Sequence, residues 1–104
     1  MSVSKAFALF MQEAPAHAEA WLQAAKSLDA ASALDKKTEE LAYLAVLAAT
    51  GNISGVPFHV VSAKSHGASR DEVLSAVLVG LPAAGAVVIG AIPAALEAYD
   101  SGSR

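Results

Sequence analysis

Apolar residues recur along this chain with helical spacing, and no stretch alternates apolar and polar residues as a half-buried strand would. In the first forty residues Phe, Trp and Leu are mixed with charged side chains at spacings of three and four, which is typical of amphipathic helices. After Glu40 the apolar runs become much longer. The pattern therefore predicts an all-α protein.

Residues 1–104 are expected to form a single domain of six helices. The predicted helices are Ser4–Glu13, Pro15 to about Ala31, Asp35 to Gly51, Gly55–His66, Ser69 to Gly80, and Pro82 to about Tyr99 with a kink or break near Pro93. The final residues, DSGSR, are expected to be a solvated tail.

Three short signals fix the predicted helix ends. Asp35 has the position of an N-cap, and Gly51 followed by Asn52 is a typical C-terminal stop because both tolerate a left-handed backbone. Ser69 and Glu72 have the spacing of a capping box. The helix after Asp35 is apolar all round beyond Glu40, so it is expected to be central.

The composition indicates a protein that associates with itself. Hydrophobic residues make up 55% and charged residues 16%, against about 45–50% and about 25% in ordinary globular domains. A small domain with so few charges is expected to bury apolar surface in a homo-oligomer. The net charge of −3 and the lack of a basic run argue against nucleic-acid binding.

The chain has no cysteine, which excludes disulfides, thiolate metal sites and thiol catalysis. The N-terminal residues lack the features of a signal peptide, so we expect a cytoplasmic protein. His17, His59 and His66 do not have metal-ligand spacing, because two ligands on one helix are expected at positions i and i+4, whereas His59 and His66 are seven positions apart. Neither a metal nor a cofactor is expected.

The run Val73–Leu96 carries no charge and is long enough to cross a membrane. However, it is rich in Ala and Gly, contains Pro82 and Pro93, and has no positive flank. We expect a buried helix pair at an oligomer interface and no membrane association.

Glu40 and His59 are the candidate catalytic residues. Glu40 stands where its helix changes from charged to apolar, and His59 lies near the start of the next helix among valines and a phenylalanine. An imidazole beside a carboxylate is suited to proton transfer. Each residue alone also has a structural explanation, as a helix-dipole partner or a core histidine. Phe58, Val61 and Ser62 are expected on other faces of the helix, and neither Ser54 nor Ser62 has the orienting group that a nucleophile would need.

The segments LDKKTEELAYLAV and FHVVSAKSHGASRDEV resemble the carboxymuconolactone decarboxylase and alkyl hydroperoxidase D (AhpD-like) family. The most specific parts are Lys37–Leu41 and His59–Ser69, and the resemblance extends from Trp21 through the last helix. In the hydroperoxidase branch this loop carries a Cys-x-x-Cys pair. The matching positions here are Asn52 and Gly55, so both sulfurs are missing while Glu40 and His59 remain.

The resemblance implies an AhpD-like helical fold, homotrimers or homohexamers, and a cofactor-independent acid–base enzyme of the decarboxylase or lyase type. Its substrate would be a small organic acid or lactone, with Glu40 and His59 moving protons. Asn52, Ser54, Gly55 and Val56 would contact the ligand, with backbone N–H groups of the last three available to an anion. Two alternatives remain: an oligomer that binds a ligand or is purely structural, and a peroxidase or disulfide reductase, which the absence of cysteine disfavours.

Overall fold

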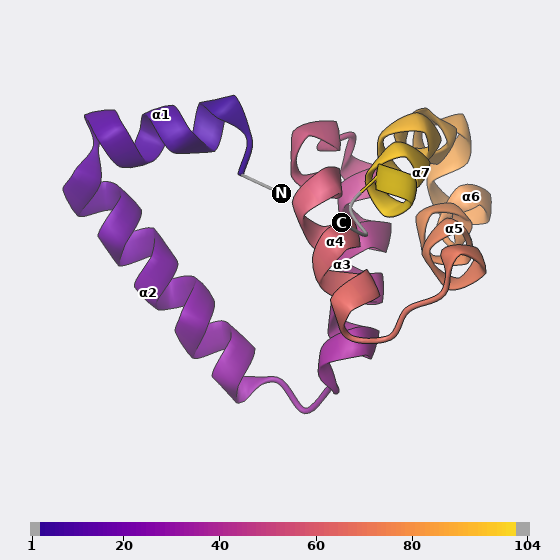
Figure 1. Ribbon diagram of the computed structural model, residues 1–104, viewed down its shortest axis with the longest axis horizontal. Coiled ribbons are helices and arrows are strands. Elements are labelled where there is room, and N and C mark those ends of the chain that lie inside the picture. Colours follow the sequence, from indigo (N-terminus) through magenta and orange to yellow (C-terminus); the bar gives the residue numbers. More distant parts are fainter. Residues whose placement is uncertain (1–2, 102–104) are drawn as a thin grey trace.

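The computed structural model describes residues 3–101, and these residues form helices and connecting turns without a β-strand (Figure 1). The α-helices are α1 (Lys5–Glu13), α2 (Pro15–Ala31), α3 (Lys36–Thr50), α4 (Val56–Ser65), α5 (Arg70–Leu78), α6 (Leu81–Ala84) and α7 (Ile92–Ser101). Two 3₁₀ segments, η1 (Ile53–Gly55) and η2 (Gly85–Ala91), lie between them. The prediction of an all-α fold is confirmed.

The helix ends follow the local signals in the sequence. The Asp35 carboxylate accepts a hydrogen bond from the Thr38 N–H at 2.8 Å, which caps α3. At the other end of α3, Gly51 has a φ of 73°, a conformation that costs glycine little. Ser69 and Glu72 form both hydrogen bonds of the predicted capping box at the start of α5.

The core lies among α3, α4, α5, η2 and α7, which we call the body. Its largest fully buried side chains are Leu44, Val56, Val60, Val73, Val77 and Val88. Small residues between them, such as Ala63 and Ala95, allow the helices to approach closely. α3 packs on α4, α5 and η2, as a central helix should. One side of α3 nevertheless stays open, since Tyr43 and Val46 are exposed.

The prediction of one long sixth helix was wrong. The chain forms the short α6, then turns at Gly85, where φ is 80°, and continues as the 3₁₀ segment η2 before α7. A left-handed residue cannot continue an α-helix, so the ladder ends there. The tail prediction was also wrong for Asp100 and Ser101, which belong to α7; residues 102–104 lie outside the described part of the chain.

α5 and α7 form an antiparallel pair. The Arg70 guanidinium, at the start of α5, donates to both carboxylate oxygens of Asp100, near the end of α7, at 2.8 and 3.0 Å. By length and composition the stretch Arg70–Ser101 is apolar enough to cross a membrane. In the structure it folds back on itself, so it is not one straight helix of that length (Figure 1).

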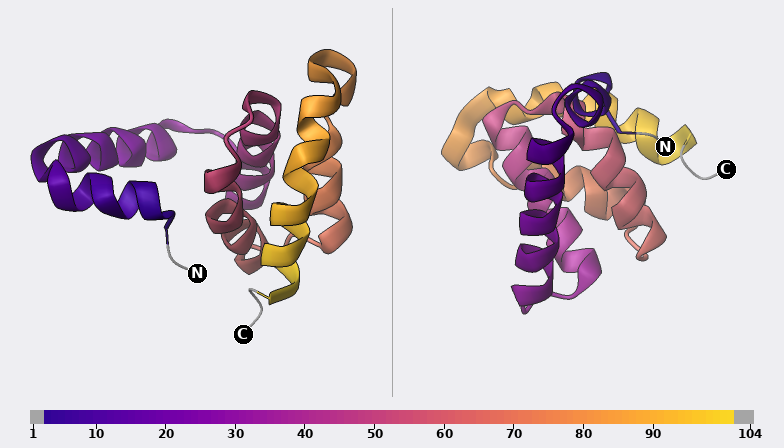
Figure 2. Two further views of the ribbon diagram at one scale, coloured as in Figure 1. Left: turned by 90° about the horizontal axis from the view of Figure 1, so that it is seen from above. Right: turned by 90° about the vertical axis from the view of Figure 1, so that its left-hand side faces the viewer.

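α1 and α2 form a separate helical hairpin, which we call the arm. The two helices pack on each other, with the Phe7 and Phe10 rings edge to face at 5.6 Å, and neither makes more than slight contact with the body. Figure 2 shows the arm lying to one side of α3–α7. Ala18 is the one buried residue in α1 and α2. The apolar residues Trp21, Leu22 and Ala25 of α2 are therefore exposed in the isolated chain.

Candidate active site

Glu40 and His59 are brought together by the packing of α3 against α4. His59 Nδ1 lies 2.8 Å from Glu40 Oε1, although the residues are nineteen positions apart in the chain. The Glu40 residue is only 7% exposed, whereas the His59 side chain is 22% exposed. The carboxylate is therefore buried behind the imidazole, and the imidazole lies between it and the surface.

The Glu40 carboxyl is held in its ionised form. Burial alone would raise its pKa, but the hydrogen bond with His59 and a contact with the Ser62 hydroxyl together outweigh burial, so the pKa of Glu40 lies below its ordinary value. An ionised carboxylate only accepts hydrogen bonds. We infer that His59 Nδ1 carries a hydrogen and that Nε2 is left with a lone pair when the ring is neutral.

Two aromatic rings border the imidazole. The Tyr43 ring is stacked on the His59 ring, with centroids 4.1 Å apart and planes 16° from parallel. The Phe58 ring meets His59 edge-on at 5.3 Å. Both aromatic residues are exposed, so they form an apolar surface around the reactive ring. The sequence analysis missed Tyr43, although its position three residues after Glu40 places it on the same side of α3.

Ser62 was assigned to the wrong face of α4. It lies three positions after His59, one turn along the helix, and its hydroxyl affects the Glu40 carboxyl. The hydroxyl lowers the pKa of the Glu40 carboxyl, and it forms no hydrogen bond with the His59 ring in the part of the chain that the structure describes. This arrangement does not activate Ser62 as a nucleophile.

The loop before α4 uses much of its own hydrogen-bonding capacity. The Gly55 N–H donates to the Asn52 carbonyl at 3.3 Å, and the Val56 N–H donates to the Ile53 carbonyl. The Asn52 side-chain amide donates to the Thr50 hydroxyl at 2.7 Å. Two of the N–H groups expected to face an anion are therefore already engaged within η1.

The three lysines of α3 and α4 are all engaged within the chain. Lys36 Nζ lies 2.7 Å from Asp29 Oδ1, and Lys37 Nζ lies 2.9 Å from Glu72 Oε2. Lys64 Nζ donates to the Tyr99 carbonyl at 2.8 Å and lies over the Tyr99 ring. The chemistry available at the site is thus proton transfer by His59, without a free lysine beside it to bind a substrate carboxylate.

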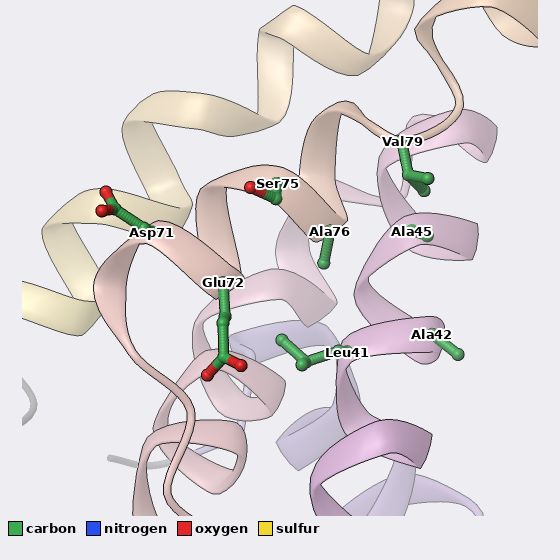
Figure 3. A pocket seen from close by; sticks show the side chains of 8 residues that line it. All are labelled: Leu41, Ala42, Ala45, Asp71, Glu72, Ser75, Ala76 and Val79. Atoms are coloured by element: carbon green, nitrogen blue, oxygen red, sulfur yellow. The ribbon is translucent and has the colours of Figure 1, made fainter.

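Two surface hollows lie elsewhere on the chain. One, of about 440 Å³, lies between α3 and α5 and is lined mainly by small apolar side chains (Figure 3). In Figure 3 the Glu72 carboxylate points toward Leu41, but that carboxylate already binds Lys37 and the Ser69 N–H. The other, of about 610 Å³, lies within the arm. Neither hollow is lined by Glu40 or His59.

The other histidines do not join this site. His66 Nδ1 lies 2.8 Å from the Ser62 carbonyl on the exposed side of α4, and His17 lines the hollow in the arm. No group of three or more potential metal ligands occurs within residues 3–101.

The sequence model of the carboxymuconolactone decarboxylase family matches residues 15–99 of this chain. The chain belongs to this family. Neither the curated proteins nor the solved structures give a significant match to the chain. The match begins with α2 of the arm and covers the body as far as Tyr99 in α7, including the Glu40–His59 pair.

Within the carboxymuconolactone decarboxylase family, this member lacks cysteine altogether. The loop positions that correspond to the thiol pair of the AhpD-like branch hold Asn52 and Gly55. Thiol–disulfide exchange needs a thiolate, so this chain cannot carry out that chemistry. The groups left at the site are the carboxylate, the imidazole and the rings around it.

In this member of the carboxymuconolactone decarboxylase family, replacing Glu40 by alanine is expected to reduce the free energy of unfolding by about 2–3 kcal/mol at neutral pH, since the ring loses a charged partner behind it. Because the folded-state pKa of Glu40 is lowered, its contribution is full above the unfolded pKa and disappears as pH falls through the folded pKa. Denaturant unfolding from pH 7 to pH 3 should therefore show a shallower loss of stability in Glu40→Ala than in the wild type.

The matched control is Glu39→Ala, which removes a carboxylate from the neighbouring position of α3. Glu39 Oε1 lies 3.7 Å from Lys36 Nζ in a partly exposed pair, so the expected cost is below about 0.5 kcal/mol. Two results would contradict the assignment of Glu40 as a buried partner of His59. One is equal stability of the two variants, and the other is a loss of stability between pH 7 and pH 3 that is the same in Glu40→Ala as in the wild type.

Proposed function

We propose that this chain is a cofactor-independent acid–base enzyme of the decarboxylase or lyase type that acts on a small organic acid or lactone. The observation that supports it is the 2.8 Å contact between His59 Nδ1 and the buried, ionised Glu40 carboxylate. This contact orients the ring and stabilises the positive charge that forms when Nε2 takes up a proton. Glu40 is a positioning residue, and His59 is the catalytic residue.

His59 alone can carry the proton in both of the reaction types considered. In a decarboxylation the bond between the substrate carbon and its carboxylate breaks, carbon dioxide leaves, and the electron pair stays on the carbon. Protonated His59 then delivers the Nε2 proton to that carbon. In a lyase-type elimination neutral His59 removes a proton next to a carbonyl, that electron pair forms a carbon–carbon double bond, and the group on the neighbouring carbon leaves with its bonding electrons. Neither reaction needs an oxidant or a thiol.

The flanking rings favour a flat, unsaturated substrate. Tyr43 is stacked on one face of the imidazole and Phe58 meets its edge, so a planar molecule next to Nε2 would lie against apolar surface. Exposed Asn52 and Ser54 in the adjoining loop, together with Gly55, would provide further ligand contacts. Val56 was also expected to contact the ligand, but it is fully buried in the core. Gly55 and Val56 both donate their N–H groups within the chain, so a contact with Gly55 would be mainly a packing contact.

The second candidate is an oligomer that binds a small ligand without converting it. It is favoured by the ion pairs of the nearby helix start, since Lys36 and Lys37 are engaged by Asp29 and Glu72 and so are not free to hold the carboxylate of a reacting acid. A carboxylate–imidazole pair could then serve as a hydrogen-bonding site alone. The two candidates differ in whether protons move between the ligand and water.

The test is proton exchange, followed with the purified chain in heavy water. A panel of small lactones, keto acids and unsaturated dicarboxylic acids is incubated with the protein, and proton NMR follows product formation and deuterium uptake at carbon. Enzyme function predicts that at least one compound gains deuterium or releases carbon dioxide faster than in buffer. Ligand-induced shifts at His59 without either change would support the binding protein, and no response to any compound would contradict both.

A further inference from the structure

The hydrogen bond between Glu40 and His59 constrains only one edge of the imidazole. It holds Nδ1 at 2.8 Å from the buried carboxylate. A ring held at one atom can still tilt about that bond, because the last torsion of a histidine side chain has broad energy wells. A catalytic group, however, needs its direction held within about 10–20°. A second contact is therefore needed to fix the plane of the ring.

The Tyr43 ring makes a contact of the required kind. Its centroid lies 4.1 Å from that of the imidazole and the two planes are 16° from parallel, so the rings are stacked. A stack resists tilting, since tilting separates the atoms on one side and forces them together on the other. The hydrogen bond and the stack thus limit different motions of the imidazole. The first holds an edge and the second holds the plane.

Both contacts come from one helix. Glu40 and Tyr43 are three positions apart on α3 and therefore project from the same side of it, whereas His59 belongs to α4. The two helices pack on each other. Leu44, which follows Tyr43 directly, is fully buried and holds this turn of α3 in the core. The plane of the imidazole is therefore set against a rigid element of the body.

Phe58, the other ring at the site, does not have the same geometry. It meets the imidazole at 74°, with centroids 5.3 Å apart. An edge contact of this kind covers little of the ring and leaves its plane less restricted. Phe58 also precedes His59 directly on α4, so it moves with the histidine and cannot hold it in place relative to α3.

The stack also suits the protonated form of the ring. The face of a tyrosine ring carries negative potential and attracts a cation that lies within about 6 Å of its centroid. The 4.1 Å separation is inside this range, so Tyr43 stabilises the imidazolium that forms when Nε2 takes up a proton. Stacking and attraction both belong to the ring and not to the hydroxyl. Phenylalanine should therefore replace tyrosine at this position.

We propose that Tyr43 is a positioning residue: its ring holds the plane of the His59 imidazole while Glu40 holds the Nδ1 edge, so that Nε2 keeps one direction in both protonation states. The stacked face is closed to a substrate, which must then approach Nε2 from another side. The effect on the ring stands on the geometry alone, whereas its consequence for turnover rests on the proposed function.

The orientation of the ring is tested without a substrate, by NMR of the protein with histidine labelled at both ring nitrogens. In the wild type, neutral His59 should carry its hydrogen on Nδ1, and the Tyr43 ring should shift its ring protons upfield. Tyr43→Phe should retain both signatures. Tyr43→Leu keeps an apolar side chain but no ring, so the upfield shift should vanish and part of the His59 population should carry the hydrogen on Nε2.

Two controls show whether these changes are local. His66 lies on the exposed side of α4, and its signals should be the same in every variant, which verifies that the body is folded. Val46→Ala shortens another exposed side chain one turn further along α3, and it should leave both His59 signatures in place.

Turnover is the second readout, measured with the compound that the exchange assay identifies. Tyr43→Leu should lower kcat by about 10–10²-fold, the cost of a small misplacement of a catalytic group. It should change KM little, because leucine still offers apolar surface to the substrate. Tyr43→Phe should retain most of the wild-type kcat.

Three results would overturn the proposal. The first is the wild-type pattern of His59 tautomers in Tyr43→Leu. The second is a Tyr43→Phe variant as impaired as Tyr43→Leu, because the role would then belong to the hydroxyl. The third is a change in KM alone, which would make Tyr43 a substrate-binding residue. If no compound reacts, the proposed function fails, and the NMR signatures still decide whether Tyr43 holds the ring.

Discussion

His59→Asn is expected to reduce turnover of whichever substrate the exchange assay identifies by about 10²–10⁴-fold, the contribution that a positioned general acid or base usually makes. Asparagine retains a polar side chain but cannot take up a proton at neutral pH. The expected loss is in kcat, because the substrate would still be bound by the rings and the loop. Steady-state kinetics on the purified variant would measure it.

His66→Asn is the matched control, since it removes an imidazole from the exposed side of the same helix. It should leave kcat within about twofold, in line with the small effects of most surface substitutions. Glu40→Gln should also lower kcat, because a glutamine amide can donate to Nδ1 and so shift the hydrogen to Nε2, where the base is needed. Equal activities of the His59 and His66 variants would exclude His59 as the catalytic residue.

Leu44→Ala is expected to reduce the free energy of unfolding by about 3–4 kcal/mol. Leu44 is fully buried on α3 between the other elements of the body, where removal of its branched end leaves a cavity that rigid helix packing cannot close. Such a loss is a large part of the stability of a domain this size, so thermal unfolding monitored by circular dichroism should shift down by well over ten degrees.

The control for Leu44 is Leu34→Ala, which makes the same chemical change in the exposed connection between α2 and α3. It is expected to change the free energy of unfolding by less than about 0.5 kcal/mol. A similar loss in both variants would mean that the body is not packed as the structure has it, and that Leu44 is not its centre.

Much of the body could be predicted from local sequence signals. Asp35, Gly51 and the Ser69–Glu72 box each act within one helical turn, so their effects do not depend on distant parts of the chain. The division of the last helix was missed because Gly85 lies in an apolar, alanine-rich run that also reads as continuous helix. The short η2 that follows it packs against α3 and α5, and such long-range contacts cannot be read from a local pattern.

The acid and the imidazole were found through the resemblance, and the structure brings them together. Their surroundings were harder to predict. Tyr43 and Ser62 each lie one turn after a site residue, and a systematic search of such positions would have found both. The arm shows more clearly what a sequence pattern leaves open. Trp21, Ala25 and Leu28 share one face of α2, which indicates that this face packs against other apolar residues. The pattern does not say where in the protein those residues lie.

The core residues of the body run from Leu44 to Ala98, and none comes from the arm. The body can therefore acquire its structure as a single chain, at a rate independent of protein concentration. Unfolding of the arm can precede unfolding of the body, since the arm contributes no residue to that core.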